Sequence, residues 1–596
     1  MSKALNEGRR VRALAASRVM RAIGSVALVT TMAAAASAQI SPAGASTVRH
    51  DERSATRVLA HRPSPHVTCT DSWIGGTGQW SFSGDWSAGV PQGETADVVC
   101  ITVPGSDVDA LGVVESIGEL VLGASTGSPS TLSVPSNDSS GTVLYVTSDS
   151  VIEPTGIVDV ASAADSSTAI SNFGTGASAA TLTNDGTIET SGYGAHLFAN
   201  LTNASSGKLS LDAQETLIDT QTVVNDGSLT VDAGAGLELD GLAFTQSSGS
   251  IDNLGTIAQN GASFDMAGGA ETHNPIDFTG GQFTDAGGTG SFLVESVSTI
   301  EGTIPKGQTV TLASTTGVGT DTDIVGANLV NRGKLVLDDE ASGQTNEIGG
   351  SPLLNYGTFD IEAVGAGAYL SAPTTNEVGG LLDATGPGFA MNQDLTNDGR
   401  LVLGAGTVVT DSGYPIVEGH VATLGLTVGA HNSSVTADAG TTFSLAGTLA
   451  ISTTKALAKG TTVRPISSVF FAVSGRFTAL SFPNAAYAVG YSATSVSLTA
   501  GTPFTAKGKA FKATKGRTAT FTVATVAGVP AKTTLSASIN WGDRSPASSG
   551  KLTVKGTTAT VRGAHKFLKV GTFTVTVTIK DSNGTIRVVT ESVKVG

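Results

Sequence analysis

Several features are scarce in this sequence, and each scarcity excludes a class of structure or function. After residue 38 no stretch reaches 18 uninterrupted apolar residues, so we expect no membrane span in the mature chain. The only two cysteines, Cys69 and Cys100, lack the C-x-x-C spacing of a redox pair. No stretch shows a sustained 3.6-residue apolar period, so we expect very little helix. These absences favour a soluble all-β protein.

The first 38 residues predict a signal peptide. A start with five arginines precedes a mostly apolar run at 22–35 and an A-x-A cleavage signal at 36–38. The pair Arg9-Arg10 also occurs in twin-arginine signals, but the residues after it fit that type poorly, so ordinary secretion is favoured. Residues 39–66, rich in Arg, His and Pro, predict a flexible leader. We therefore expect a secreted protein, extracellular or associated with the cell surface, in which Cys69 and Cys100 most simply form one disulfide bond.

Charge is distributed unevenly along the chain. Residues 501–596 contain 15 Lys and Arg against three acids, a net charge of +12. Residues 39–500 contain 13 basic and 46 acidic residues, a net charge of −33, and no Lys or Arg occurs between Pro63 and Gly207. The long acidic part should repel nucleic acid and anionic polymers, whereas the C-terminal part should attract anionic partners. We therefore expect no nucleic-acid partner.

A seven-residue phrase recurs six times between Leu182 and Leu401: apolar, any, Asn, any, Gly, any, apolar. When the looser copies at Asn203 and Asn376 are counted, the asparagines of consecutive copies within 184–253 and within 331–397 are 19 to 28 residues apart. Asn and Gly suit a tight corner because they enter left-handed backbone conformations at low cost, and the flanking apolar residues suit short strands. A near-constant period of this size predicts a parallel β-helix, a solenoid whose coils bury their apolar faces against one another. We place the repeats at 105–439.

The asparagines of the phrase are candidates for a structural role. Stacked at one corner of successive coils, they can form a ladder of amide hydrogen bonds along the solenoid axis. The asparagines of this expected ladder are Asn184, Asn225, Asn253, Asn331, Asn355 and Asn397. Looser copies of the phrase lie around Asn172, Asn203 and Asn376.

Residues 67–104 contain three of the four tryptophans of the chain and many glycines. Trp73, Trp80 and Trp86 lie in a phrase that resembles the start of bacterial secreted β-solenoids, where a similar phrase precedes the first coils. Two interpretations of these tryptophans remain open. They could cover the exposed sheet edge at the end of the solenoid, pinned by the disulfide, or they could form a platform that stacks on glycans. The cap is the favoured interpretation.

Residues 440–500 predict the other end of the solenoid. The repeated phrase gives way there to longer strands, among them 475–480 and 487–492. This segment resembles the closing coils of secreted bacterial β-helix passengers, the adhesin-like parts of autotransporters, in which a Gly-x-Phe strand leads to a Val/Tyr-rich hairpin. We therefore expect a C-terminal cap of the β-helix at 440–500.

The last residues, 501–596, carry a separate signature. Trp541, Gly542 and Asp543 are followed by His565 and Phe567 in a W-G-D-x-S and a G-x-H-x-F pattern. This pattern resembles that of the PKD domain, an Ig-like β-sandwich found in many extracellular proteins. The resemblance implies a role in spacing, adhesion or docking to proteins and glycans rather than in catalysis.

Two positions depart from the family pattern, and one of them is Phe567, which stands where tyrosine is frequent. Arg544 stands where the family commonly has glycine, and it changes the charge of the turn. Independently of the family, residues 572–580 alternate apolar and polar, and the Asn-Gly pair at 583–584 suits a hairpin turn. In the favoured interpretation Trp541 is core, Asp543 caps a turn and His565 bonds a backbone group. In the other interpretation these residues form a ligand site.

A search for catalytic groups finds no convincing set. Lyases that act on acidic glycans need a base, yet residues 63–450 contain only five Lys or Arg. Arg332-Gly-Lys334 has a spacing found in polygalacturonase-like hydrolases, but no G-H-G motif accompanies it. Asp338-Asp339-Glu340 is better explained as a solvated loop. The eight histidines show no metal-ligand spacing, so we expect no metal and no cofactor.

The favoured hypothesis is a non-enzymatic, secreted bacterial surface or extracellular protein. Its acidic β-helix would act as a rigid, adhesive rod. Its basic PKD-like domain would attach the rod to cell-wall or extracellular glycans, or to other surface proteins. The alternative is an extracellular carbohydrate-active enzyme of the β-helix type, a polysaccharide lyase or a glycoside hydrolase. The enzyme requires several acids that converge in a cleft.

Overall fold

The computed structural model describes residues 68–596 except 93–96, 137–141, 163–170, 176–179, 199, 219–221, 262, 314–319, 326–328, 340–344, 364–367, 438–441, 470–472, 484 and 531–532. The described residues belong to one compact unit, His66–Gly596. The expected signal peptide (1–38) and leader (39–66) lie outside them. Within the described part, helix is limited to the 3-10 turn η1 (Ser83–Asp85), and no helix is long and apolar enough to cross a membrane.

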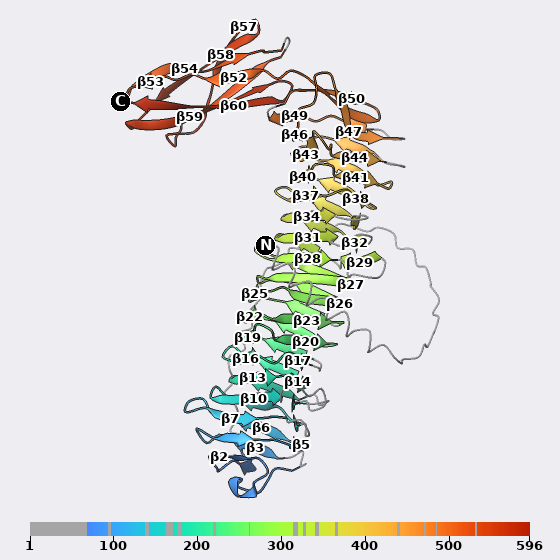
Figure 1. Cartoon of the computed structure of the whole chain (residues 1–596), viewed down its shortest axis with the longest axis vertical. Coiled ribbons are helices and arrows are strands. Elements are labelled where there is room, and N and C mark those ends of the chain that lie inside the picture. Colours follow the sequence, from blue (N-terminus) through green and yellow to red (C-terminus); the bar gives the residue numbers. More distant parts are fainter. Residues whose placement is uncertain are drawn as a thin grey trace, which may run out of the picture. The chain divides into compact units, whose positions relative to one another are not determined.

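From β1 to β49 the chain winds into a parallel β-solenoid with three faces (Figure 1). Strands of one face pair in parallel and in register with the strands of the coil before and the coil after. The all-β parallel solenoid predicted from the sequence is therefore confirmed. Because each strand completes its backbone hydrogen bonds only through its neighbours, the coils stabilise one another in sequence along the axis.

The strands of each face follow a fixed order along the chain. The first face consists of β2 (Thr77–Gln79), β4 (Asp107–Asp109), β7 (Ser130–Ser133), β10 (Gly156–Ser162), β13 (Thr187–Gly192), β16 (Lys208–Leu211), β19 (Ser228–Val231), β22 (Ser250–Asn253) and β25 (Ala270–His273), and in the later coils of β30 (Leu329–Asn331), β33 (Leu353–Asn355), β36 (Thr374–Asn376), β39 (Leu395–Asn397), β42 (Ile416–Glu418), β45 (Phe443–Leu445) and β48 (Val473–Gly475). The second face consists of β5 (Val114–Ile117), β8 (Thr142–Val146), β11 (Ser171–Gly174), β14 (Gly194–Phe198), β17 (Glu215–Ile218), β20 (Gly236–Asp240), β23 (Thr256–Asn260), β26 (Ile276–Asp285), β27 (Ser291–Ile304), β28 (Thr309–Ala313), β31 (Lys334–Asp339), β34 (Thr358–Ala363), β37 (Leu381–Thr385), β40 (Arg400–Leu403), β43 (Thr423–Val428), β46 (Thr448–Thr453) and β49 (Ala479–Pro483). The third face consists of β1 (Asp71–Ser72), β3 (Val98–Ile101), β6 (Glu119–Leu122), β9 (Ser150–Ile152), β12 (Thr181–Asn184), β15 (Asn200–Asn203), β18 (Thr222–Asn225), β21 (Ala243–Gln246), β24 (Ser263–Met266), β29 (Thr320–Val325), β32 (Thr345–Gly350), β35 (Ala368–Ser371), β38 (Gly388–Met391), β41 (Val408–Asp411), β44 (Ser434–Ala437) and β47 (Thr462–Ser468).

Two long strands, β26 and β27, turn from the second face onto the third without a break. Residues 276–279 of β26 pair with β23 on the second face, and residues 282–285 pair with β24 on the third. The register between β26 and β27 shifts between Thr279 and Gly281, and Gly280 and Gly281 both have positive φ, which lets the strand bend at the corner.

The interior of the solenoid is a stack of like residues. On the second face, Leu335, Phe359, Leu382, Leu401 and Leu424 hold the same register position in successive coils, and each is at most 3% exposed. Within each strand, the residues next to the buried position are more exposed, which is the alternation expected of strands with one face inward.

The C-terminal end of the solenoid is covered by an antiparallel hairpin of β50 (Tyr487–Ser492) and β51 (Ser495–Ala500). β51 also pairs antiparallel with β47 of the last coils. Parallel coils continue through β48 and β49, well beyond residue 439, where the repeats were expected to stop. The phrase marks only one corner of a coil, so coils that lack it still wind as long as apolar residues alternate along their strands.

Residues after 504 form two largely antiparallel sheets with a core of their own. The first sheet has the order β52 (Thr505–Gly508), β54 (Thr518–Ala527), β58 (Thr558–Lys566) and β57 (Lys551–Lys555). The second sheet joins β56 (Ser548–Ser549), β55 (Leu535–Asn540), β59 (Gly571–Asp581), β60 (Thr585–Val595) and β53 (Lys512–Ala513). The core between them includes Phe504, Trp541 and Phe567. This arrangement is a β-sandwich, and its assignment to the PKD family stays a prediction.

The sandwich also contacts the last coils of the solenoid. β60 pairs in parallel with β49, and Phe482 N donates a hydrogen bond to Gly584 O at 2.7 Å. Gly584 has φ 89°, and a Cβ there would lie 2.6 Å from Leu480 Cβ. The Asn-Gly turn expected from the sequence therefore also meets the end of the solenoid.

Candidate functional site

An amide ladder runs along one corner in the first half of the solenoid. Asn184, Asn203 and Asn225 end β12, β15 and β18, Gln246 ends β21, and all four are 0% exposed. Each asparagine Nδ2 donates to the side-chain oxygen of the next residue, at 2.8, 2.7 and 2.7 Å. Asn184 Nδ2 also donates to Lys208 O at 3.0 Å. The neighbouring coils thus satisfy most of these buried amide groups.

A second ladder occupies another corner in the second half. Asn331, Asn355, Asn376 and Asn397 end β30, β33, β36 and β39, with nitrogen–oxygen distances of 2.7, 2.8 and 2.7 Å. This ladder ends on a carboxylate, because Asn397 Nδ2 donates to Glu418 Oε2 at 2.8 Å. An acceptor oxygen suits this position, since the last amide presents a donor. Burial raises the pKa of Glu418 to about 7, although the hydrogen bond from Asn397 opposes the rise.

The phrase predicts a single row of asparagines, but the structure contains two ladders at different corners. Asn253 ends β22 on the first face and does not join the ladder of Asn225, where Gln246 holds the next position. Asn253 Nδ2 donates instead to the backbone carbonyls of Asn274 and Pro275, at 3.0 and 3.2 Å. The phrase therefore changes corner between Asn225 and Asn253: the earlier copies join the third face to the first, and the later copies join the first to the second.

The glycine of the phrase is required by close packing between coils. Neither Gly186 nor Gly333 has positive φ, so the left-handed corner expected from the sequence is wrong. A Cβ on Gly186 would lie 2.3 Å from Gly156 O, and one on Gly333 would lie 2.3 Å from Pro305 O. The coils approach each other so closely at these corners that a larger residue would push them apart.

Two further acids are buried near the middle of the solenoid. Asp285 is 0% exposed and accepts a hydrogen bond from Gln308 Nε2. Burial raises the pKa of Asp285 to about 8, and Asp265 contributes to the rise. Glu271 accepts a hydrogen bond from Ser291 N at 2.6 Å, and burial raises its pKa to about 7. Both carboxyl groups are enclosed, so neither is placed to act on a polymeric substrate.

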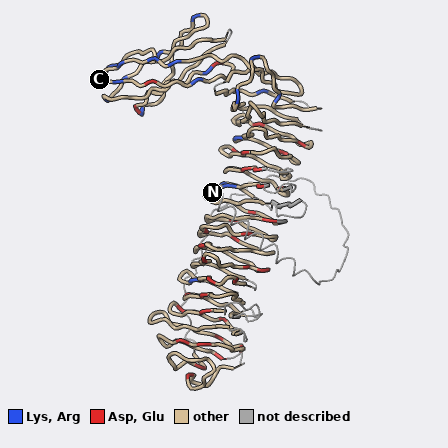
Figure 2. The backbone as a smooth tube through the Cα atoms, in the orientation of Figure 1, with Lys and Arg blue, Asp and Glu red and all other residues tan. Residues whose placement is uncertain are grey.

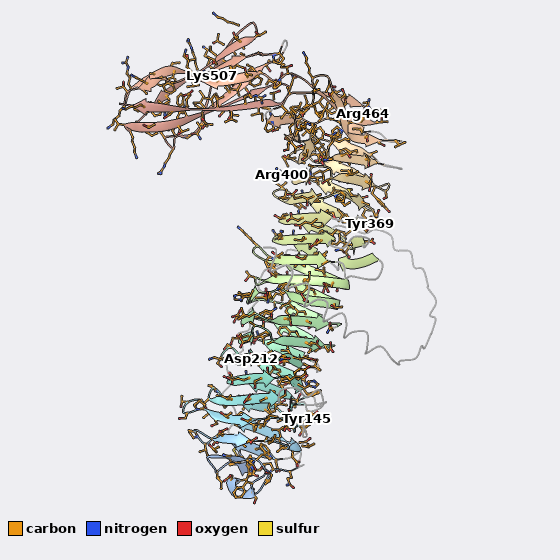
Figure 3. The ribbon with its side chains drawn as sticks, viewed as in Figure 1. Tyr145, Asp212, Tyr369, Arg400, Arg464 and Lys507 are labelled. Atoms are coloured by element: carbon orange, nitrogen blue, oxygen red, sulfur yellow. A yellow bond between two sulfur atoms is a disulfide. The ribbon has the colours of Figure 1, made fainter. Side chains whose placement is uncertain are left out.

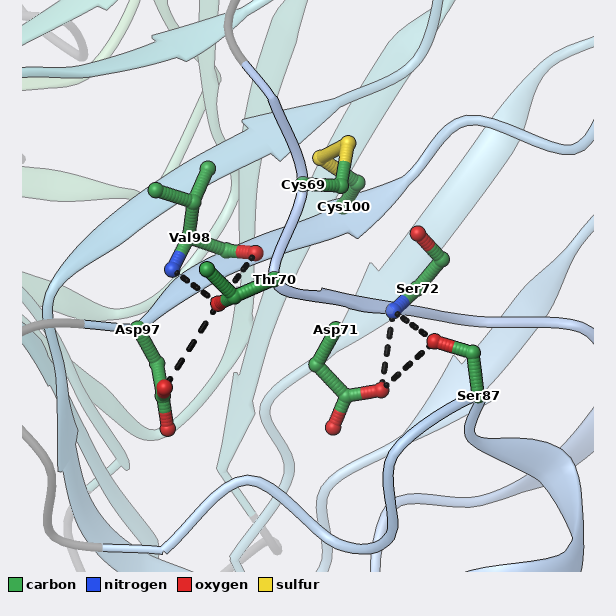
Figure 4. Close-up of a disulfide and its surroundings, with 8 residues drawn as sticks. All are labelled: Cys69, Thr70, Asp71, Ser72, Ser87, Asp97, Val98 and Cys100. Carbon is green, nitrogen blue, oxygen red and sulfur yellow. Dashed lines mark hydrogen bonds between the residues drawn. A yellow bond between two sulfur atoms is a disulfide. The ribbon is translucent and has the colours of Figure 1, made fainter.

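The N-terminal cap is built from the three tryptophans and from the disulfide, which Figure 4 shows. Cys69 and Cys100 are bonded, so the predicted disulfide is confirmed. Trp73, Trp80 and Trp86 are 1%, 1% and 3% exposed, and the rings of Trp73 and Trp80 lie 5.0 and 4.9 Å from that of Trp86, edge to face. Rings buried to this extent offer no face to a sugar, so the platform interpretation is contradicted and the cap interpretation fits.

Asp71 connects the segment after Cys69 to the rest of the cap through hydrogen bonds. Its Oδ1 accepts hydrogen bonds from Ser72 N at 2.8 Å, Ser87 Oγ at 3.1 Å and Ala88 N at 2.9 Å, and Figure 4 shows the first two partners. Because Asp71 is 5% exposed, these donors take the place of water around its carboxyl oxygen.

The signature residues of the C-terminal domain lie together. The ring of Trp541 is 0% exposed and stacks on that of His565, with centroids 4.5 Å apart. His565 Nε2 lies 2.8 Å from Asp543 Oδ2, and Ser545 Oγ donates to Asp543 Oδ1 at 2.6 Å. Burial alone would raise the pKa of Asp543, but the hydrogen bonds from Ser545 and His565 outweigh it and lower the pKa. His565 therefore bonds a carboxylate, not the expected backbone group.

Gly542 and Phe567 complete this cluster. Gly542 has φ 75°, and a Cβ there would lie 2.3 Å from Thr574 O, so glycine is required by both conformation and space. Phe567 is 1% exposed, and its ring meets that of His565 edge to face at 4.6 Å. The contacts of all five signature residues lie within the domain, which explains them as parts of the fold.

The candidate catalytic cations have structural partners. The guanidinium carbon of Arg332 lies 4.6 Å from the ring centroid of Tyr356, and Lys334 Nζ lies 2.9 Å from Asp360 Oδ2. Asp360 is the register neighbour of Asp383 on the next coil, and burial, followed by repulsion from Asp360, raises the pKa of Asp383. In the part of the chain that the structure describes, no group of three or more His, Cys, Asp or Glu is arranged to hold a metal ion.

The solenoid and the C-terminal domain carry charge of opposite sign. Figure 2 shows Asp and Glu along the coils, and Lys and Arg gathered in the sandwich. Arg400 and Arg464 are among the few cations on the solenoid, while Lys507 belongs to the sandwich (Figure 3). Successive coils place like charges side by side, for example Asp159 next to Glu189. Burial, and then Glu189, raises the pKa of Asp159. The described chain thus presents an acidic column and a basic domain.

Fold and site together define the class: a capped parallel β-solenoid with buried amide ladders, followed by a basic β-sandwich. No protein-family model matches the chain, and no curated protein matches it. Among solved structures, it is similar to the crystal structure of the Haemophilus influenzae Hap adhesin, with 11% sequence identity and a TM-score of 0.26. The match covers 69% of this chain and 60% of the adhesin chain. The solenoid fold rests on the strand pairing described above, independently of this likeness.

Proposed function

We propose that this protein is a secreted bacterial surface or extracellular protein whose solenoid serves as a rigid adhesive or spacing rod. Secretion is supported by the first 38 residues and by the disulfide, a bond that persists in oxidising compartments. Rigidity is supported by the continuous in-register pairing of the coils and by the buried amide ladders. Both ends of the column are covered, which protects it from pairing edge to edge with other sheets.

The C-terminal sandwich, of the PKD type, is the proposed attachment module. One observation carries this proposal: the net charge is +12 in 501–596 and −33 in 39–500. Cell-wall polymers and many extracellular glycans are anionic, so they attract the sandwich and repel the solenoid. An anionic partner would therefore be held at one end of the chain.

The test measures binding of the mature chain, 39–596, to purified cell-wall material over a range of salt concentrations. We expect binding at low salt that weakens as salt rises, because the attraction is screened. A chain that ends at residue 500 should stay unbound while its circular dichroism remains that of a folded solenoid. Binding that is absent, or that is insensitive to salt, would argue against attachment through the basic domain.

The carbohydrate-active enzyme remains the alternative proposal. Such an enzyme needs two or more carboxyl groups facing one glycosidic bond. The acids whose pKa is raised furthest, Asp285, Glu271 and Glu418, are at most 5% exposed and lie in the interior. Release of oligosaccharides from a panel of wall and extracellular glycans would favour the enzyme and replace the structural role.

A further inference from the structure

One end of the C-terminal sandwich exposes apolar and basic side chains together. We call its loops 514–517 and 567–570 the distal loops. Leu568 and Val570, between β58 and β59, are 68% and 62% exposed. The neighbouring Lys566 and Lys569 are exposed as well. Aliphatic side chains at the apex of a loop contribute little to the core of the domain, and they mark a surface suited to an apolar partner.

Backbone contacts bring further cations to this end. Gly516 N donates to Phe567 O at 2.8 Å, which places one distal loop against the other. Lys515 N donates to Gly596 O at 2.8 Å, and Lys512 on β53 is the register neighbour of Lys594 on β60. The exposed cations gathered in this way are Lys512, Lys515, Arg517, Lys566, Lys569 and Lys594.

The three acids of the domain leave this charge largely uncancelled. Asp543 lies near this end, but its carboxylate is engaged by His565. Asp581 ends β59, an eleven-residue strand that starts at the distal loops with Gly571, so it lies about 34 Å away along the strand. Glu591 pairs with the fifth residue of β59, about 14 Å from Gly571. The distal loops therefore combine a cluster of cations with two exposed aliphatic side chains.

We propose that the distal loops bind an anionic lipid bilayer, with Leu568 and Val570 entering its interface and the surrounding cations contacting headgroups. This inference rests on the proposed attachment role and names its partner. A wall polysaccharide would engage the cations and leave the two aliphatic side chains in water, whereas a bilayer accommodates both. The acidic solenoid is repelled by the same surface, so contact through the distal loops is favoured over contact along the rod.

The first arm of the test compares vesicles of phosphatidylcholine with vesicles that also contain about one third phosphatidylglycerol, using the mature chain. We expect co-sedimentation with the anionic vesicles only, weakened by salt. Replacing Leu568→Ser together with Val570→Ser should lower partitioning about tenfold or more. The matched control replaces Val554→Ser and Val588→Ser, which are 50% and 57% exposed on β57 and β60, and should leave partitioning unchanged.

The second arm addresses the cations. Lys566→Gln together with Lys569→Gln should lower partitioning about fivefold per charge removed. Lys551→Gln together with Lys555→Gln, on the edge strand β57, removes the same charge away from the distal loops and should have a much smaller effect. Equal losses in the two double variants would mean that net charge alone, and not the distal loops, drives binding, which would overturn the inference.

The third arm reports insertion and separates this inference from the attachment role. Tryptophan at the loop apex, introduced as Leu568→Trp, should shift its fluorescence to the blue on anionic vesicles and be quenched by brominated lipids, relative to the unmodified chain. Binding to cell-wall material without binding to vesicles overturns the bilayer and leaves the attachment role standing. Binding neither to cell-wall material nor to vesicles overturns both the bilayer and the attachment role. Vesicle binding that the serine double variant retains in full overturns insertion of Leu568 and Val570.

Discussion

At the scale of single residues, the buried amides hold each coil in register with the next. Asn355 accepts a hydrogen bond from Asn331 and donates to Asn376 Oδ1 and Leu381 O. We expect Asn355→Ala to leave buried groups on both neighbouring coils without partners and to cost roughly 2–5 kcal/mol. The measurement is hydrogen exchange of β30 to β39, which should become faster, together with a lower thermal midpoint.

A matched substitution tests whether burial in the ladder is the cause. Asn392, also on the solenoid, is half-buried and donates to Ser371 Oγ at 3.1 Å. Asn392→Ala removes the same chemical group outside the ladder and should lower the midpoint by much less than Asn355→Ala. Similar decreases of the thermal midpoint in the two variants would show that a position in the buried ladder does not make an asparagine more stabilising.

Glu418 makes the stability of the solenoid depend on pH. Burial raises its pKa from 4.5 to about 7 in the folded chain, so its contribution is complete below about pH 4.5 and is lost as pH rises through 7. The loss amounts to about 3 kcal/mol. Glu271 and Asp285, with pKa values raised by burial to about 7 and about 8, act in the same direction.

Thermal midpoints measured from pH 5 to pH 8 check this dependence. The unmodified chain should lose stability across that range. Glu418→Gln keeps an acceptor for Asn397 and removes the ionisation, so its midpoint should fall less steeply and exceed that of the unmodified chain at pH 8. The exposed Glu215 provides the control, because Glu215→Gln should leave the slope unchanged. A midpoint that rises with pH in the unmodified chain would contradict the assignment.

At the scale of structural elements, the cap protects the coils nearest to it. Cys69 and Cys100 are 31 residues apart, and removing their bond with Cys69→Ser and Cys100→Ser should cost about 2–4 kcal/mol. Because each coil of the solenoid contacts only its neighbours, the loss of stability should be largest in the coils nearest the disulfide. Hydrogen exchange should therefore become faster in β3 and β6 and stay unchanged in β40 and β43. Faster exchange along the whole solenoid would instead indicate a single cooperative unit.

Most of this element-level architecture could be predicted from the sequence, because the repeated phrase and the alternation within strands are local signals. The position of each ladder could not. The phrase specifies a corner without specifying which faces it joins, so Asn253 and Asn225 look equivalent in sequence and occupy different corners. Gln246 and Glu418 hold ladder positions without the phrase, and the signal that could have found them is a polar residue ending an otherwise apolar strand at the repeat spacing.

For the signature residues of the sandwich, too, the sequence predicts the residues but not their contacts. Its residues could be picked out from their pattern, but the partner of His565 could not, because Asp543 lies 22 residues away in sequence and meets it only when β58 packs beside the turn after β55. The sequence favours burial of Trp73, Trp80 and Trp86 in a cap but does not prove it, since the same residues also suit a platform until their neighbours are placed.

At the scale of the whole molecule, the uneven charge predicts opposite effects of salt on folding and on binding. Like charges on successive coils, such as Asp159 and Glu189, repel across short distances, and this repulsion weakens as the screening length falls from about 30 Å at 0.01 M salt to about 10 Å at 0.1 M. The thermal midpoint of the solenoid at pH 8 should therefore rise with salt over this range. Glu189→Thr should reduce that rise.

Attraction between the basic sandwich and an anionic surface is screened by the same ions, so binding should weaken in the buffers in which the solenoid becomes more stable. Measuring the midpoint and the bound fraction in one salt series therefore separates the two effects. Loss of binding that follows unfolding of the rod would require the midpoint to fall with salt, whereas loss of binding through screening occurs while the midpoint is constant or rises. A midpoint and a bound fraction that fall together would remove the physical basis for treating the acidic column and the basic domain as surfaces with separate tasks.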